Sequence, residues 1–416
     1  MARCCFNKEL KEIYRCEYEI TEECITVDIE YDVYTENTTG IISSNDIFKE
    51  RDILIVDSAK KKSFLLKNAI FGGKNSRFGT IDSIDASRFF SYEYFEAGDG
   101  NALCDLFGAL SVKSLRIYSE AINDYYYHPS VVVKDTDDTH EILLQKERKE
   151  QSVILNDHNI EKIYLGDDWH SVSNNKSISI DINGYFGMSF INTVDHTEIY
   201  KYIREVMIYM QLFYPGKFII KKMSLEIDGK NYWYVSKSTR QIKHSSRIID
   251  FSVKDDMLTF LKNCYIKMPY RDTEGATRNI PYVVMRPYRN IEDNFLMSFR
   301  FLEYYYKAKN PKWKNWKVIK EAIKHHYKDK ELDKKTIEKE VREIVALRNH
   351  YVHSGYYIHE TNLLVTYKED NVKKEYYVEA NVSWLRDRVE MLYNLVIDII
   401  FTEILGYQEY SFRNVF

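Results

Sequence analysis

Arg348, Asn349 and His353 are the residues of this sequence whose types and spacing best suit catalysis. They lie at the end of a predicted helix over residues 335–352, in which Arg348 falls on the apolar stripe that should face a core. A guanidinium in that position must be paired or must line a cleft, because an unpaired buried charge is costly. The apolar members of the stripe are Ile337, Val341, Ile344, Val345 and Val352.

An arginine and a histidine five residues apart on one helix lie in adjoining sectors of its surface, so both can reach one ligand beside the helix end. Cleavage of RNA by internal attack needs this pair. A neutral histidine takes the proton from the ribose 2′-OH or gives one to the leaving 5′-oxygen. A fixed arginine binds the scissile phosphate and stabilises the charge of the transition state. This chemistry requires neither a metal nor a cofactor, and none is expected.

Short runs of alternating apolar and polar residues dominate the first 190 residues, with many β-branched or aromatic members. Their spacing predicts an antiparallel sandwich or barrel with one inserted helix at 197–213 and a hairpin around Asp228-Gly229. A hairpin turn is also predicted at 72–76, where the phosphate-loop pattern GxxxxGK[ST] is not met. The clearest predicted strands are 24–31, 52–56, 63–67, 88–94 and 177–182.

From about residue 253 the apolar residues recur at helical spacing. A short hairpin around Asp370-Asn371 is predicted just before the last helix. The fold class is therefore α+β, with a β-rich N-terminal domain over residues 1–250 and a helical domain over residues 251–416. The predicted helices are 255–268, 290–308, 313–327, 335–352 and 383–405.

The charge of the chain is unevenly distributed. A formal net charge of −4 argues by itself against a dedicated nucleic-acid binder. Residues 1–100 carry 13 basic and 19 acidic side chains, whereas residues 307–335 carry 11 lysines and four acidic residues. Lysines interleaved with Trp313 and Trp316 suit a phosphate backbone with unstacked bases, although a solvated helix face has the same composition. The residues expected to contact RNA are Lys312, Lys314, Lys317, Lys320 and Lys324.

The run Arg348-Asn349-His350-Tyr351-Val352-His353 resembles the RNxxxH motif of the HEPN ribonucleases, which lies near the end of a helix in a small helical bundle. A β-rich first half, a helix ending in the sequence FRFLEYYY and a motif helix near the C-terminus together resemble the ApeA-like HEPN proteins, which are bacterial abortive-infection defence factors. The resemblance that bears the motif covers residues 290–416. The first 250 residues match only in length and β character.

This resemblance implies a metal-independent endoribonuclease whose HEPN domains pair, giving a homodimer or higher even oligomer with two motifs in one cleft. Arg348 and His353 are implied as catalytic residues, and Asn349 as a positioning residue. An ion pair from Glu303 is expected to hold Arg348. Further residues expected to support the site are Arg300, His350 and Tyr351, the last either stacking on a base or simply packed.

The leading hypothesis is a toxin-like ribonuclease of anti-phage defence that its β-rich, sensing domain restrains until infection. Its substrate is RNA, with tRNA loops as one candidate, and a phage-derived trigger or inhibitor is a candidate partner. The alternative is a non-catalytic module that dimerises and binds a ligand or protein. A third option, a small-molecule enzyme in the β-rich half, lacks any recognisable nucleophile–base arrangement.

The cysteine pattern and the apolar segments predict a cytoplasmic protein without a membrane anchor. The six cysteines include no CxxC pair, so buried reduced thiols are expected rather than a zinc site. The first residues lack the apolar core of a signal peptide. The most hydrophobic stretch, residues 389–405, is interrupted by polar and charged residues and is not expected to span a bilayer.

Overall fold

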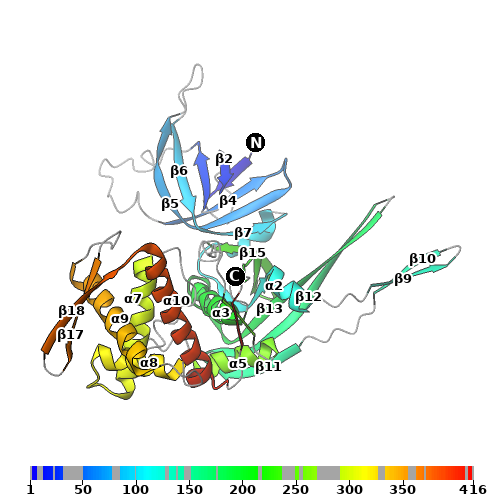
Figure 1. The fold of residues 1–416 in the computed structure, drawn as a ribbon. Helices are drawn as coiled ribbons and strands as arrows, with labels where there is room; N and C mark the ends of the chain where they lie inside the picture. The colour runs from blue at the N-terminus through cyan, green and yellow to red at the C-terminus, as the bar shows by residue number, and fades with distance from the viewer. Residues whose placement is uncertain are drawn as a thin grey trace. The chain divides into compact units, whose positions relative to one another are not determined.

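The computed structural model of the chain divides into two compact units, which are described separately (Figure 1). The first comprises Met1–Arg204 and Phe218–Ile242, and the second Glu205–Lys217 and Lys243–Phe416. The sequence predicts a domain boundary near residue 250, and the structure divides the chain after Ile242. The second unit also includes Glu205–Lys217, which the prediction assigns to the N-terminal domain. The described residues are 2–6, 13–21, 24–30, 50–76, 85–98, 100–126, 131–136, 139–144, 151–174, 177–213, 218–236, 249–252, 256–268, 291–326, 333–354, 362–369, 372–407 and 411–414.

Six antiparallel strands of the first unit close into a barrel, in the order β1–β2–β3–β6–β5–β4 and back to β1. Closure gives each of these strands a partner on both sides, so the barrel has no free edge. The α+β class with a β-rich N-terminal region is thus confirmed, and the barrel is the form it takes here. The strands are β1 Ala2–Cys5, β2 Tyr14–Ile20, β3 Ile25–Ile29, β4 Arg51–Asp57, β5 Lys62–Ser76 and β6 Asp85–Ser91.

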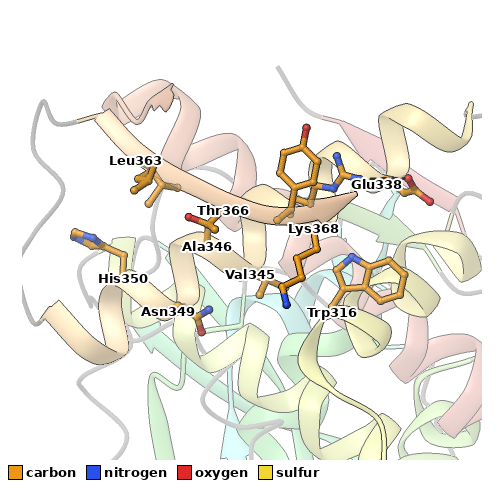
Figure 2. A pocket seen from close by; sticks show the side chains of 12 residues that line it. Trp316, Glu338, Val345, Ala346, Asn349, His350, Leu363, Thr366 and Lys368 are labelled. Atoms are coloured by element: carbon orange, nitrogen blue, oxygen red, sulfur yellow. Dashed lines mark ion pairs between the residues drawn. The ribbon is translucent and has the colours of Figure 1, made fainter. Parts of the chain in front are cut away.

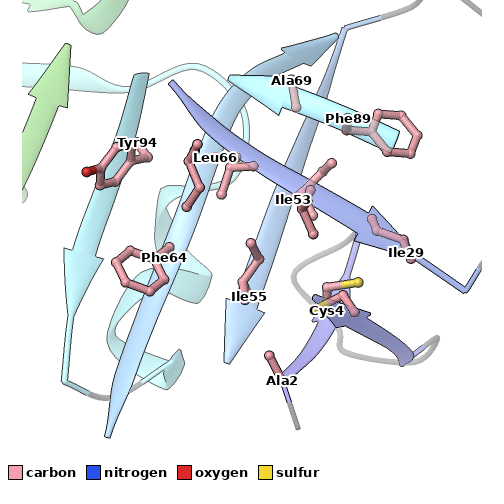
Figure 3. Packing of buried hydrophobic residues seen from close by; sticks show 13 residues of the cluster. Ala2, Cys4, Ile29, Ile53, Ile55, Phe64, Leu66, Ala69, Phe89 and Tyr94 are labelled. Atoms are coloured by element: carbon pink, nitrogen blue, oxygen red, sulfur yellow. The ribbon is translucent and has the colours of Figure 1, made fainter. Parts of the chain in front are cut away.

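Alternation along the strands fills the inside of the barrel with apolar side chains (Figure 3). Successive side chains of a strand point to opposite faces, so every second residue of β3 is fully buried while the residues between are half-buried. β4 and β5 contribute aliphatic and aromatic side chains to the same cluster. Its members include Ile25, Val27, Ile29, Ile53, Ile55, Phe64, Leu66 and Phe89.

β5 belongs to the barrel and also to the sheet beyond it. Besides its pairing with β4, its first half pairs with β7 and its second half with β6. The register shifts between Phe71 and Gly73, where Gly73 has a φ of 123° that side-chain-bearing residues rarely adopt. The hairpin turn predicted at 72–76 is therefore wrong. The glycines serve a bulge inside one long strand.

Seven further antiparallel strands extend this sheet from β7 to β11. The predicted hairpin at Asp228-Gly229 is confirmed as the link between β14 and β15, where both residues have positive φ (49° and 76°), as a type I′ turn requires. The predicted helix at 197–213 is found as α3, Ile199–Phe213, which crosses the division between the units. The strands are, in sheet order, β7 Glu93–Ala97, β15 Lys230–Ser236, β14 Lys222–Ile227, β8 Ser111–Tyr118, β13 Ser177–Asp195, β12 Ile160–Asn174 and β11 Gln151–Asp157.

The second unit is a helical bundle with an inserted hairpin, as the sequence predicts. The hairpin is β17 (Asn362–Glu369) and β18 (Val372–Glu379), and β17 lies against α9 (Figure 1). The last predicted helix continues beyond α10 into a π-helical segment, Ile400–Leu405. The helices are α5 Met257–Lys267, α7 Ile291–Lys309, α8 Asn315–His326, α9 Lys334–Ser354 and α10 Val382–Ile399. None of the helices among the described residues is long and apolar enough to cross a membrane.

The buried face of α9 differs from the predicted stripe. Leu347 and Tyr351 occupy the core beyond Ile344, whereas Val352 is 47% exposed and Arg348 is only half-buried. A helical period of 3.6 residues allows either set of positions, and the larger apolar side chains remove more surface from water. The prediction that Arg348 faces the bundle core is therefore wrong, and Arg348 flanks the core instead.

A buried ion pair attaches α9 to α10. The Glu343 side chain is 2% exposed, and its Oε2 accepts a hydrogen bond of 2.8 Å from Nη2 of Arg388. Arg388 also lies 3.8 Å from a carboxylate oxygen of Glu340 and stacks over Trp384. Such a pair fixes the geometry of its two elements, since the loss of either partner leaves a poorly solvated charge.

We expect Glu343→Ala to lower the free energy of unfolding of the helical unit by about 3 kcal/mol, because Arg388 loses its closest carboxylate. Lys339→Ala is the control, since Lys339 is 69% exposed and only 3.9 Å from the same carboxylate. That change should cost less than about 0.5 kcal/mol. Urea unfolding followed by far-ultraviolet circular dichroism measures both values, and equal midpoints for the two variants would contradict the role given to the pair.

Candidate functional site

Arg348 lies on the penultimate turn of α9 and is held by two neighbours. Its Nη1 donates a hydrogen bond of 3.2 Å to Oδ1 of Asn349. Its guanidinium carbon lies 5.9 Å from the ring centre of Phe299, a buried residue of α7. A guanidinium over an aromatic face gains a modest electrostatic attraction without being neutralised. Within the described part of the chain no carboxylate pairs with Arg348, so its charge is available to an anionic ligand.

His353 is exposed on the last turn of α9, which ends at Ser354. The described residues give its imidazole no hydrogen-bond or ion-pair partner. Arg348 and His353 are thus carried by one helix end, five residues apart, with one group held and the other exposed. A third motif residue, Asn349, is exposed and positions Arg348 through its side chain.

Two predicted supporting residues do not reach the motif. Glu303 of α7 forms its ion pair with Lys307, one turn along the same helix. Both Glu303 and Arg348 are described and no ion pair joins them, so the expected pair is wrong. An i,i+4 lysine satisfies that carboxylate locally. Arg300 is exposed and has no described contact with the motif.

Tyr351 is a packing residue. It is 9% exposed, and its ring meets that of Phe295 edge-on at 5.6 Å between centres. Burial, with a smaller contribution from Glu292, raises the pKa of the Tyr351 phenol above its ordinary value. Of the two interpretations that the sequence left open, the structure supports the packed one, because a buried ring cannot stack on a base.

A groove of about 770 Å³ runs along α9 between α8 and β17 (Figure 2). Val345 and Ala346 give it an apolar wall, while Asn349 and His350 bring two residues of the motif segment into its lining. The groove therefore reaches the helix end that carries Arg348. The remaining lining residues are Trp316 from α8, Glu338 and Arg342 from α9, and Leu363, Leu364, Thr366, Tyr367 and Lys368 from β17.

Two cation–aromatic pairs border this groove. Lys320 Nζ lies 4.5 Å from the ring centre of Trp316, and the guanidinium carbon of Arg342 lies 3.8 Å from that of Tyr367. Both cations also approach the carboxylate of Glu338, at 3.3 Å and 3.6 Å. One carboxylate thus balances part of the charge of two cations, and the groove keeps a positive excess.

The five lysines expected to contact RNA fall into two groups. Lys317 and Lys324 pair with Glu321, and Lys320 pairs with Glu338. Ion pairing on one helix face therefore offsets much of the charge that the sequence concentrates there. The other two, Lys312 and Lys314, are exposed just before α8 and have no described ion pair.

Among the residues that line the groove, sequence reasoning did not single out Arg342, Tyr367 or Lys368, which carry its charge and part of its aromatic surface. Arg342 lies within the motif helix on its polar side, and the other two lie on β17 of the inserted hairpin. No local spacing signals them, since only the pairing of β17 with β18 and its packing on α9 bring them to this place. Trp316 did carry a signal, as an aromatic residue within the lysine-rich stretch.

Comparisons with known proteins identify no relative: no family model, no curated protein and no solved structure matches this chain. Among the described residues, no three His, Cys, Asp or Glu side chains gather closely enough to hold a metal ion.

We expect Tyr351→Phe to raise the free energy of unfolding of the helical unit by about 1 kcal/mol, because the Tyr351 hydroxyl is buried and finds no hydrogen-bond partner among the described residues. Tyr351→Ala should lower it by about 3 kcal/mol, since it leaves a cavity beside Phe295. Urea unfolding of the two variants checks the pair of values. A loss in Tyr351→Phe as large as in Tyr351→Ala would show that the hydroxyl does form a stabilising bond.

Proposed function

We propose that this chain is a metal-independent endoribonuclease of the HEPN type, acting in anti-phage abortive infection, with Arg348 and His353 as its catalytic residues. The observation that carries the proposal is the helix end itself. A guanidinium that has no carboxylate partner among the described residues and an exposed imidazole lie five residues apart on α9, and Asn349 accepts a hydrogen bond from the guanidinium. The resemblance in motif and domain order supplies the reaction type and the defence context.

In the proposed reaction, neutral His353 removes the proton from a ribose 2′-OH, and the 2′-oxygen attacks the adjacent phosphorus. The bond from phosphorus to the 5′-oxygen breaks, and that oxygen takes up a proton. The products are a 2′,3′-cyclic phosphate and a 5′-hydroxyl. Arg348 binds the phosphate and stabilises the charge that develops on its oxygens. Pairing of two copies, which the resemblance implies, brings a second His353 that can protonate the leaving oxygen.

A non-catalytic RNA-binding module is the second candidate. The groove beside α9 favours this candidate. Its aromatic and cationic side chains could bind RNA whether or not His353 takes part in catalysis. Both candidates place RNA at the same helix. They differ in whether the strand is cut, which a cleavage assay decides.

We expect His353→Ala and Arg348→Ala each to reduce RNA cleavage in EDTA by at least about 100-fold, because each removes a group that acts on the reacting phosphate or its nucleophile. The assay follows total RNA and tRNA on denaturing gels. Arg386→Ala, which removes an exposed arginine of α10, is the matched control and should cleave like the parent.

Two results would count against this assignment. Undiminished cleavage by the double variant would show that another site cuts RNA. Intact RNA at every concentration of the parent chain would favour the binding module instead.

A further inference from the structure

The groove between α8, α9 and β17 has the chemical make-up of a binding site for a flat, anionic ligand. Val345 and Ala346 form an apolar wall, and Leu363 adds to it from β17. Trp316 presents an aromatic surface that is 40% exposed. An exposed aromatic ring at the edge of a groove offers a face on which a flat ligand can stack.

Lys368 is a cation of this groove for which the described residues supply no ion-pair partner. Lys368 extends from β17 toward Val345, with Trp316 alongside it on α8 (Figure 2). Its ammonium makes no ion pair with any described residue, and the nearby carboxylate of Glu338 already has Arg342 and Lys320 close to it. An anionic group entering the groove therefore meets an unneutralised positive charge next to an aromatic ring.

The groove is also linked to the proposed catalytic residues. Asn349 lines it and accepts the hydrogen bond from Arg348. His350, the next residue, lines it as well. A ligand in the groove therefore lies along the same helix as the phosphate that Arg348 is proposed to bind.

We propose that this groove binds one unpaired nucleotide of the RNA substrate, with its base stacked on Trp316 and its phosphate at Lys368. The inference rests on the proposed function for the identity of the ligand. The volume of the groove, about 770 Å³, falls within the range of small-molecule sites and is far too small for a helix of nucleic acid. Bases in a duplex are stacked and unavailable, so the groove selects single-stranded loops or ends. A base on Trp316 fixes the position of the strand relative to Arg348.

The test measures binding separately from cleavage. A fluorescein-labelled single strand of about ten nucleotides is made with 2′-O-methyl riboses, which lack the attacking hydroxyl, and its binding to the full chain is followed by anisotropy. We expect Trp316→Ala to weaken binding by about tenfold or more, and Trp316→Phe to retain most of the affinity, because stacking needs only an aromatic face. Trp233→Ala, which removes a similarly exposed tryptophan of the first unit, should bind like the parent.

Salt and duplex controls complete the test. Lys368→Ala should reduce the slope of log affinity against log salt concentration by about one, as expected for the loss of one phosphate contact. A duplex of the same length should bind at least about tenfold more weakly than the single strand. Parental affinity in Trp316→Ala, or equal affinity for the duplex, would overturn the proposal, and so would a failure of the parent chain to bind the single strand.

The binding experiment can succeed or fail independently of the cleavage assay. Arg386→Ala should bind the 2′-O-methyl strand as the parent does, because Arg386 is an exposed residue of α10 that does not line the groove. If the parent chain does not cut natural RNA while Trp316→Ala and Lys368→Ala still weaken binding, the groove assignment stands and the catalytic one fails.

Discussion

The rotation of α9 about its own axis decides what the candidate site contains. Leu347 and Tyr351 pack inward, and the buried Glu343 carboxylate pairs with Arg388 of α10. A helix turns by about 100° per residue, so a shift of one position would bury Arg348 and expose Leu347. With the observed rotation, the apolar face meets the bundle and the motif lies at its flank. Packing that takes no part in chemistry therefore determines which groups can reach a ligand.

The same helix then serves two surfaces. Its last turns present a guanidinium and an imidazole at the helix end, while the turns before them form one wall of the groove beside β17. The inserted hairpin is what makes the second surface, because Tyr367 and Lys368 come from it. In the first unit, one element also serves two structures: the bulged strand β5 belongs to both the barrel and the sheet beyond it.

Much of the architecture could be predicted from the sequence, because apolar periodicity and turn residues are local signals. The helices of the second unit, its hairpin and the Asp228-Gly229 turn illustrate this. Closure of the barrel depends on pairings between distant strands, and the glycines near residue 72 suit a bulge as well as a turn. At the site, periodicity could not separate Arg348 from Leu347 as the buried residue. The expected ion pair between Glu303 and Arg348 could not be judged from the sequence either, because Lys307, one turn along the same helix, is an alternative partner for Glu303.

We propose that the end of α9 cleaves RNA through attack by the ribose 2′-hydroxyl. The most direct test of this proposal is cleavage, in EDTA, of a substrate whose natural cut site has been mapped and then synthesised with one 2′-deoxynucleotide on the 5′ side of the scissile phosphate. We expect the unmodified strand to yield a 2′,3′-cyclic phosphate and the deoxy substitution to abolish cleavage at that position, because the attacking hydroxyl is missing. Cleavage of the deoxy strand at the same bond would contradict the proposal.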